Sequence, residues 1–187
     1  MAKKNPLPEE TRSLIKTTAS ALFRTGGIYA TSLGEIAKAA KLSKGTLYYH
    51  FPAKEYLVLE IAEAHFSYIT ELLFAWIDTL SIKSDVREAL SCLTSSLLSD
   101  KEALRLHFAL LGEALREEGQ LSSRLNAKQR EWAVMLEVGS LRMEQAASSR
   151  FREYSAAYLA LLDGFGLHML LNSRLDADVL NSLLTGL

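Results

Sequence analysis

The sequence predicts an all-α fold in which a three-helix unit at the N-terminus precedes a larger helical unit. All three prolines, Pro6, Pro8 and Pro52, lie in the first third of the 187 residues, so no proline interrupts a helix after residue 52. Alternating β-branched runs bounded by Asn-Gly or Asp-Gly turns are absent, which leaves little room for a sheet. Apolar residues instead recur at spacings of three and four, as in amphipathic helices.

The first helix is expected from about Glu9 to Thr25. Its first turn is acidic, which suits the positive end of a helix dipole, and Gly26-Gly27 supplies a stop at its C-terminus. Five apolar residues are expected to share its buried face: Leu14, Ile15, Ala19, Leu22 and Phe23.

Two short helices joined by a tight turn are expected next. Ser32 and Glu35 have the spacing of a capping box, which starts the first of them. After a break at Lys41-Leu42, Ser43 is a good N-cap for the second, residues 44–50. Two short helices after a supporting helix make a helix-turn-helix.

A long helix is expected over residues 53–80, because Pro52 closes the N-terminal unit. Apolar and aromatic side chains continue through it at spacings of three and four, at Leu57, Ile61, His65, Tyr68, Leu72, Trp76 and Leu80. Further helices are expected near residues 85–99, 101–118, 121–148, 152–172 and 176–186.

The charge distribution divides the chain into two expected domains, residues 1–54 and 55–187. The first holds nine Lys or Arg against three Glu, a net charge of +6. The second holds twelve Lys or Arg against nineteen Asp or Glu, a net charge of −7. A basic domain on an acidic one is typical of a protein that contacts nucleic-acid phosphates with one end.

The second helix of the helix-turn-helix has the composition of a DNA-reading helix. Such a helix enters the major groove and presents its N-terminal residues to the base edges. Residues 44–50 use only Leu47 for the core and leave two tyrosines, Tyr48 and Tyr49, for the outer face. The open alternative is that these tyrosines cover a local apolar cluster or a protein interface.

The segment from Thr31 to Leu57, TSLGEIAKAAKLSKGTLYYHFPAKEYL, resembles the N-terminal domain of the TetR family of bacterial repressors. The resemblance covers residues 9–57 closely and the rest only in length and helical pattern. It implies a homodimer, a palindromic operator in double-stranded DNA and a small-molecule inducer. Two positions depart from the pattern, since Lys41 replaces the usual turn glycine and Pro52-Ala53 stands before Lys54.

The resemblance also implies which residues contact DNA. Thr31 and Ser32 would hold a phosphate at a helix N-terminus. The base-reading side would carry Lys44, Gly45, Thr46 and Tyr48, and phosphate contacts would come from Tyr49, His50 and Lys54. The full expected set is Thr31, Ser32, Ser43, Lys44, Gly45, Thr46, Tyr48, Tyr49, His50 and Lys54.

The larger domain is expected to form a homodimer and to enclose an inducer cavity. Its last helices carry an apolar surface wider than one helix face needs, and two glycines lie within a helix at Gly164 and Gly166. The alternative is burial within one protomer. The expected interface consists of Tyr158, Leu162, Phe165, Gly166, Met169, Leu180 and Leu184.

An inducer cavity would lie among the central helices and would take an apolar or aromatic ligand. His107, Glu113 or Asp163 could supply a polar contact. Ordinary core packing is the alternative for each lining residue. The expected lining is Tyr68, Trp76, Cys92, His107, Phe108, Trp132, Met135 and Met143.

Other classes of protein find little support in the sequence. A di-iron helical-bundle enzyme needs paired Glu-x-x-His motifs, and none is present. We therefore expect no enzyme activity, cofactor or metal site. No apolar run reaches the length of a membrane span, and no signal peptide is apparent, so a cytoplasmic regulator is expected. A ligand-independent DNA-binding or architectural protein remains the alternative.

Overall fold

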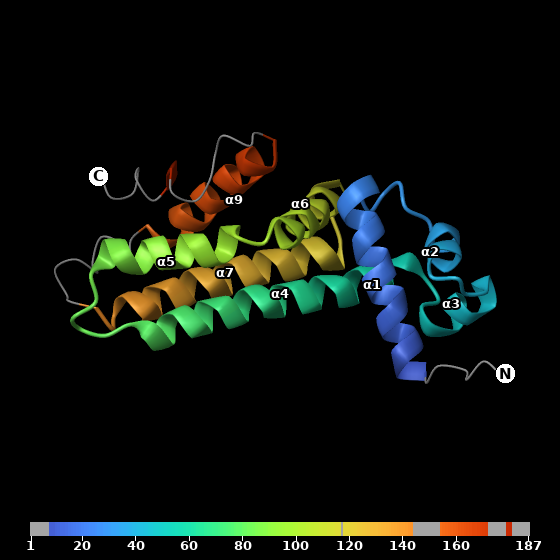
Figure 1. The fold of residues 1–187 in the computed structure, drawn as a ribbon, viewed down its shortest axis with the longest axis horizontal. Helices are drawn as coiled ribbons and strands as arrows, with labels where there is room; N and C mark the ends of the chain where they lie inside the picture. Colours follow the sequence, from blue (N-terminus) through green and yellow to red (C-terminus); the bar gives the residue numbers. More distant parts are fainter. Residues whose placement is uncertain (1–7, 117, 144–153, 172–178, 181–187) are drawn as a thin grey trace.

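The computed structural model describes residues 8–116, 118–143, 154–171 and 179–180, and these residues form helices without any strand (Figure 1). The expected all-α fold is confirmed. Most of the predicted helix 176–186 lies outside the described residues. The helices are α1 (Pro8–Gly26), α2 (Leu33–Ala39), α3 (Lys44–His50), α4 (Lys54–Thr79), α5 (Val86–Leu98), α6 (Lys101–Arg116), α7 (Gln120–Ser140) and α9 (Ser155–Leu171).

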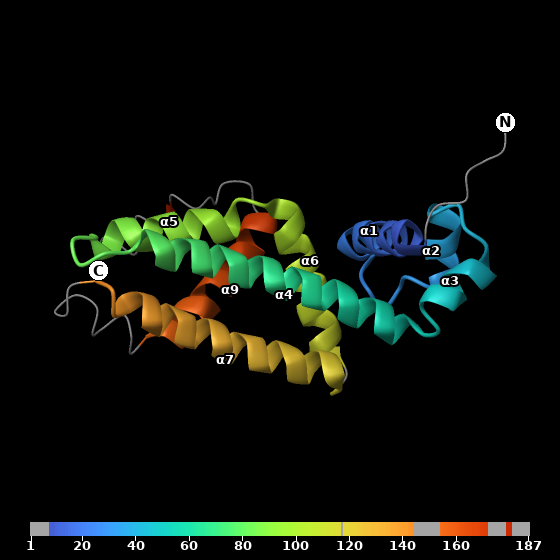
Figure 2. The same ribbon diagram turned by 90° about the horizontal axis from the view of Figure 1, so that it is seen from below.

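The helices form two parts at opposite ends of an elongated molecule (Figures 1 and 2). Helices α1, α2 and α3 pack together at one end. Helices α4, α5 and α7 run along the long axis of the other part, and α9 packs on α7 and α5. The long helix α4 belongs to both parts, since it begins beside α3 and continues to the far end. Helix α6 lies between the two parts and packs against α1 as well as α7 and α9.

The caps predicted for the helix-turn-helix are present. The hydroxyl of Ser32 accepts the Glu35 N–H at 3.2 Å, and the Glu35 carboxylate accepts the Ser32 N–H at 2.7 Å. The N–H and the hydroxyl of Ser32 both donate to the Glu35 carboxylate and hold its pKa below its ordinary value. The Ser43 hydroxyl accepts the Thr46 N–H at 3.0 Å and caps α3. Local side-chain chemistry therefore sets where both short helices begin.

The turn between α2 and α3 is a Schellman motif with a lysine in the left-handed position. The N–H of Leu42 donates to the carbonyl of Ala37 at 2.9 Å, and the N–H of Lys41 to that of Lys38 at 3.1 Å. Lys41 has a φ of 57°, in the left-handed region that glycine adopts without strain. A residue with a Cβ is strained there by about 1–2 kcal/mol.

Replacing Lys41 by glycine should raise the free energy of unfolding by about 0.5–1 kcal/mol. The relief of the left-handed strain exceeds the added entropy of glycine in the unfolded chain, which costs about 0.4–1 kcal/mol. Urea unfolding followed by circular dichroism measures the change. Lys38→Gly, on the exposed side of the neighbouring helix α2, is the control and should lower stability by about 1 kcal/mol. A loss of stability in both variants would contradict the account.

The core differs from the sequence prediction at helix α1. Leu14 is 43% exposed, although it was expected on the buried face. The buried residues lie at a regular spacing of four, which turns the buried stripe one residue away from Leu14. Those buried residues are Thr11, Ile15, Ala19 and Phe23.

Helix α7 ends earlier than predicted, at Ser140 rather than near residue 148. The N–H groups of Arg142 and Met143 bond to carbonyls three residues before them, so the backbone leaves the α-helical pattern in a tighter turn. The Arg142 guanidinium donates to the carbonyl of Ile77 at 2.8 Å and ties this turn to the end of α4. A tertiary contact therefore accompanies the end of α7, where the sequence has no proline.

Candidate nucleic-acid interface and internal cavity

Helix α3 presents most of its side chains to solvent. Leu47 is completely buried, whereas Tyr48 is 50% exposed and Tyr49 is 80% exposed. Lys44 and Gly45 at the start of the helix are also exposed. Large exposed tyrosines beside a lysine form a surface that can contact base edges and phosphates.

Several residues predicted to contact DNA have structural partners within the domain. Thr31 is buried, and its hydroxyl donates to the carbonyl of Gly27 at 2.8 Å. Ser32 and Ser43 are exposed and use their hydroxyls as helix caps. Thr46 shares a hydrogen bond of 2.8 Å with Ser43. These four residues shape the helix-turn-helix whether or not they also touch DNA.

Lys54, predicted to contact phosphate, holds the loop between α1 and α2. Its ammonium donates to the carbonyls of Ile28, Tyr29 and Thr31 at 2.9, 3.3 and 3.2 Å. Three carbonyl acceptors match the three donors of an ammonium group. In this structure the first residue of α4 thus fixes the position of the helix-turn-helix relative to the long helix.

Arg12 of α1 links the end of α3 to α4, a role that no motif in the sequence indicates. Its guanidinium forms an ion pair with Glu60, donates to the carbonyl of His50 at 3.0 Å and lies 4.4 Å from the centre of the Phe51 ring. The hydrogen bond to Glu60 raises the pKa of Arg12. Because Arg12 and Glu60 are far apart in sequence, no local pattern could reveal the pair.

Helix α6 contacts the helix-turn-helix part near both of its ends. At its start, Glu102 forms an ion pair of 3.0 Å with Arg24 of α1. At its end, the Arg116 guanidinium lies 4.8 Å from the ring centre of Tyr29, in the loop after α1. A movement of α6 would therefore act directly on α1 and on the loop that precedes α2.

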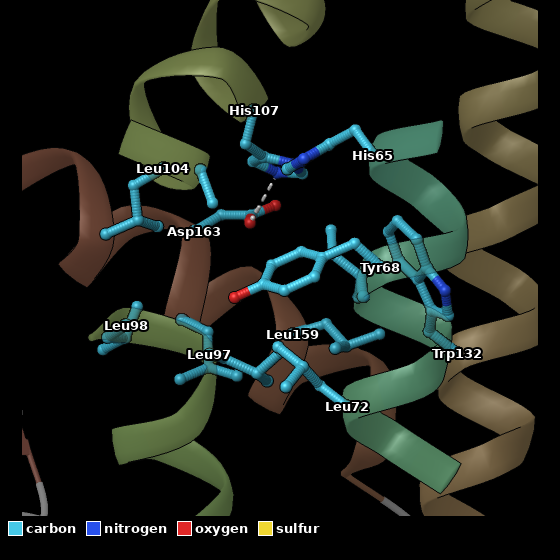
Figure 3. Close-up of a pocket in the computed structure, with 13 residues that line it drawn as sticks. His65, Tyr68, Leu72, Leu97, Leu98, Leu104, His107, Trp132, Leu159 and Asp163 are labelled. Carbon is cyan, nitrogen blue, oxygen red and sulfur yellow. Dashed lines mark hydrogen bonds and ion pairs between the residues drawn. The ribbon is translucent and has the colours of Figure 1, made fainter. Parts of the chain in front are cut away.

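A cavity of about 60 Å³, partly open to solvent, lies between α4, α5, α6, α7 and α9 (Figure 3). Most of its wall is aliphatic or aromatic. Tyr68, predicted as a ligand contact, extends into it, with its hydroxyl pointing toward the side lined by Leu97 and Leu98. The lining residues are His65, Tyr68, Ile69, Leu72, Leu97, Leu98, Ala103, Leu104, His107, Trp132, Leu159, Leu162 and Asp163.

Three of the eight residues predicted to line an inducer cavity do so, namely Tyr68, His107 and Trp132. Trp76 packs elsewhere in the core, where its indole N–H donates to the carbonyl of Ala89 at 2.8 Å. Cys92 is exposed. Glu113, suggested as a polar contact, lies instead in a separate groove of about 360 Å³ near the start of α4. The other three, Phe108, Met135 and Met143, do not line the cavity.

A chain of three polar groups crosses the cavity wall. Nε2 of His65 lies 3.2 Å from Nδ1 of His107, and Nε2 of His107 lies 3.2 Å from a carboxylate oxygen of Asp163. Both histidines are buried. Burial and, secondarily, the charge of His107 lower the pKa of His65 to about 3, so this imidazole is neutral near pH 7. Helical spacing placed His65 on the apolar stripe of the long helix, but no pattern in the sequence indicated the link between these groups.

The residues predicted for a dimer interface are largely buried within the protomer. The Tyr158 hydroxyl bonds to that of Thr94 at 2.8 Å, and Leu162 lines the cavity. A Cβ at Gly166 would lie 3.2 Å from a methyl group of Leu104, so this glycine allows close packing inside the protomer. Met169 and Leu180 are buried, Phe165 is half-buried, and Leu184 lies outside the described residues.

The exposed side of α9 carries a different apolar stripe. Its small and aliphatic residues recur every three or four positions. Gly164, which would meet no atom within 4 Å if it carried a Cβ, lies at the middle of this stripe. The residues of this α9 stripe are Ala157, Ala160, Leu161, Gly164, Leu167 and Leu171.

Comparisons with known proteins agree with this geometry. Residues 15–61 match the family described as "Bacterial regulatory proteins, tetR family". The HTH-type transcriptional regulator LmrA of Bacillus subtilis (strain 168) is 30% identical over 160 residues, which cover 83% of this chain and 84% of LmrA. This chain belongs to the TetR family. It is accordingly a DNA-binding transcriptional regulator of the helix-turn-helix type.

Solved structures of TetR-family and related regulators have the same fold. A TetR-family member from Streptomyces coelicolor A3 (SCO1917) is 22% identical, with a TM-score of 0.72 over 94% of this chain and 96% of that one. NalD of Pseudomonas aeruginosa, a secondary repressor of the MexAB-OprM multidrug efflux pump, is 28% identical. Its TM-score is 0.65, over 95% of this chain and 94% of NalD. Within the described residues of this TetR-family chain, none of the helices has the length and apolar character needed to span a membrane.

Proposed function

We propose that this TetR-family regulator is a repressor that binds a palindromic operator as a homodimer and leaves it when a small apolar or aromatic molecule enters the cavity. Residues 1–54 would read DNA, and residues 55–187 would dimerise and bind the ligand. NalD, which has the same fold, is described as a repressor, and this supports the direction of control.

The observation that carries the proposal is that α6 touches both the cavity and the helix-turn-helix. Leu104 and His107 of α6 line the cavity. The same helix pairs with Arg24 through Glu102 and packs Arg116 against Tyr29. A ligand that displaced α6 would thus act on α1 and the loop before α2.

The α9 stripe is the surface we assign to the homodimer. Small residues at Ala157, Ala160 and Gly164 allow two helices to approach closely, and Leu161, Leu167 and Leu171 would be buried between them. Leu171 is 75% exposed in the single protomer, so contact with a second copy would remove much of its surface from water. The interface residues expected from the sequence would then support the stripe from inside the protomer.

Repression and release follow from the separation of the two α3 helices in such a dimer. Binding to both half-sites requires the helices to lie about 34–36 Å apart, one turn of DNA. A ligand that binds more tightly to a dimer with another separation shifts the population away from DNA. Moving the balance from 1:99 to 99:1 needs about 5.5 kcal/mol of differential affinity.

Selection of bound sequences from random double-stranded DNA tests the proposal. We expect a palindrome whose half-site centres lie one or more helical turns apart. Selection of no preferred sequence would favour an architectural DNA-binding protein, and selection of a single unpaired half-site would contradict the dimer.

Tyr48→Ala should weaken binding to the selected operator by about 1–3 kcal/mol and leave binding to unrelated DNA nearly unchanged. A base-reading side chain contributes to specific complexes, whereas unspecific binding comes from phosphate contacts. Fluorescence anisotropy at two salt concentrations measures both affinities. Tyr154→Ala removes another exposed tyrosine, in the other part of the molecule, and should change neither. Equal losses on both DNAs would exclude base reading by Tyr48.

A further inference from the structure

Within the described part of the chain, the side chains that line the cavity include an acidic group but no lysine or arginine. Asp163 is the carboxylate in the wall, and no lysine or arginine occurs among the described residues that line the cavity. The basic side chains in the wall are two histidines, one from α4 and one from α6. Tyr68 from α4 is the remaining titratable group, and burial raises the pKa of its phenol. The electrostatic character of the cavity therefore depends on these four side chains.

When both imidazoles are neutral, hydrogen bonding fixes how they are arranged. A carboxylate only accepts hydrogen bonds, so the Nε2 of His107 must carry the hydrogen that it shares with Asp163. Nδ1 of His107 is then an acceptor, and it receives the Nε2–H of His65. Each imidazole then uses its single N–H in the hydrogen bonds that link His65, His107 and Asp163. Neither imidazole can then donate to a ligand, and the negative charge stays on Asp163.

Asp163 retains the capacity to bind a donor. One carboxylate oxygen accepts from His107, and the other forms no hydrogen bond within the described part of the chain. The side chain is 35% exposed, so a molecule in the cavity can reach it. The hydroxyl of Tyr68 likewise has no hydrogen-bond partner among the described residues, and its aromatic ring extends into the cavity.

We infer that the cavity selects a small organic cation, an amine with one aromatic or aliphatic body, whose ammonium binds Asp163 while its body packs on Tyr68, Trp132 and the leucines. This inference rests on the proposed function and narrows its ligand. A charge-assisted hydrogen bond to a carboxylate is stronger than a neutral one, and aromatic faces attract cations. An anionic ligand would meet Asp163 without any lysine or arginine to offset the repulsion.

The volume of the cavity limits the size of the ligand. A water molecule needs about 10–15 Å³ measured in this way, so about 60 Å³ corresponds to roughly four to six water positions. A single aromatic ring with a short chain is the appropriate scale for the part of a ligand that the cavity holds. The inference therefore specifies both the charge and the size of the ligand.

Calorimetric titration of the full chain with three matched probes tests this selection. The probes are 2-phenylethylammonium, the neutral 2-phenylethanol and the anionic phenylacetate, at pH 8, where ordinary imidazoles are neutral and an alkylammonium is charged. We expect the amine to bind at least about tenfold more tightly than the alcohol, and phenylacetate to bind most weakly. Equal binding of amine and alcohol, tighter binding of phenylacetate, or no binding of the amine at millimolar concentration would overturn the inference.

Two variants test whether the carboxylate of Asp163 causes the preference for the amine. Asp163→Asn keeps the shape and the acceptor for His107, and it should remove the preference for the amine while leaving the alcohol unchanged. Asp78→Asn removes a carboxylate that is 78% exposed and does not line the cavity, so it should preserve the preference. A preference that survives Asp163→Asn overturns the inference. Should this variant fail to fold, the probe comparison on the unchanged protein still decides the ligand charge.

Release of operator DNA separates the two proposals. If the amine binds through Asp163 but the protein stays on its operator, the inference about the cavity stands and ligand-controlled repression fails. If phenylethanol or phenylacetate releases the DNA while the amine does not, ligand control stands and selection of a cation fails.

Discussion

Replacing Gly139 by alanine should lower the free energy of unfolding by about 2–4 kcal/mol. A Cβ at this position of α7 would lie 2.5 Å from one carbon of the Trp76 ring, 2.9 Å from another and 3.3 Å from a carbon of Ile77. The indole is 3% exposed and has no room to retreat. Forcing extra atoms into a packed core costs about 1–3 kcal/mol.

The hydrogen bond of Trp76 makes this substitution more costly. The indole N–H donates to the carbonyl of Ala89 at 2.8 Å, joining α4 to α5. A shift of the ring would leave a buried donor without its acceptor, at a cost of about 1–3 kcal/mol. The gain in helix propensity from glycine to alanine, about 1 kcal/mol, offsets only part of the loss.

Thermal and urea unfolding measure the effect of Gly139→Ala, with tryptophan fluorescence reporting on the indole environment. Gly112→Ala is the matched control, because Gly112 lies within α6, is exposed and would meet no atom within 4 Å. That variant should be more stable than the parent by up to about 1 kcal/mol. If Gly139→Ala were as stable as Gly112→Ala, the close contact between α4 and α7 would be disproved.

His65 should make the protein progressively less stable in acid. Its pKa is about 3 in the folded protein, against an ordinary value of about 6.5 in the unfolded chain. A lowered pKa means that the unfolded chain binds the proton more readily. The stability from the neutral buried imidazole is therefore complete above pH 6.5 and is lost as the pH falls from there toward 3. The slope is about 1.4 kcal/mol per pH unit.

Unfolding free energies at pH 7.5, 6.5, 5.5 and 4.5 measure this loss. The variant His65→Gln cannot acquire the proton, so the difference in stability between the parent and this variant should shrink by about 1.4 kcal/mol per pH unit below 6.5. If the free energies of unfolding of the parent and of His65→Gln fell in parallel with pH, His65 would not contribute to the loss of stability in acid.

Residues close in sequence account for what could be predicted of the helix-turn-helix. Ser32 and Glu35 are three residues apart, and the Ser43 cap acts on Thr46, so the starts of α2 and α3 depend on short-range hydrogen bonds. The positive φ of Lys41 follows equally from its position in the turn. The exposed tyrosines of α3 follow from the helical period, which gives only Leu47 to the core.

The cavity and the exposed face of α9 could not be predicted in the same way. Helical spacing identified apolar residues of the larger part but not which neighbour each would meet. Gly166 therefore appeared as a dimer residue, although it packs on Leu104 of its own protomer. The contact that Lys54 makes within the protomer could not be predicted for a similar reason, since its three carbonyl acceptors lie more than twenty residues before it.

The amino-acid sequence by itself determined the helical class, the helix-turn-helix and the family of this regulator, because caps, turns and helical period act over a few residues. Only the tertiary structure decided which groups meet. His65, His107 and Asp163 lie on α4, α6 and α9, and their hydrogen bonds link residues 42 and 56 positions apart. The packing of separate helices brings them together, and no periodicity within one helix carries that information.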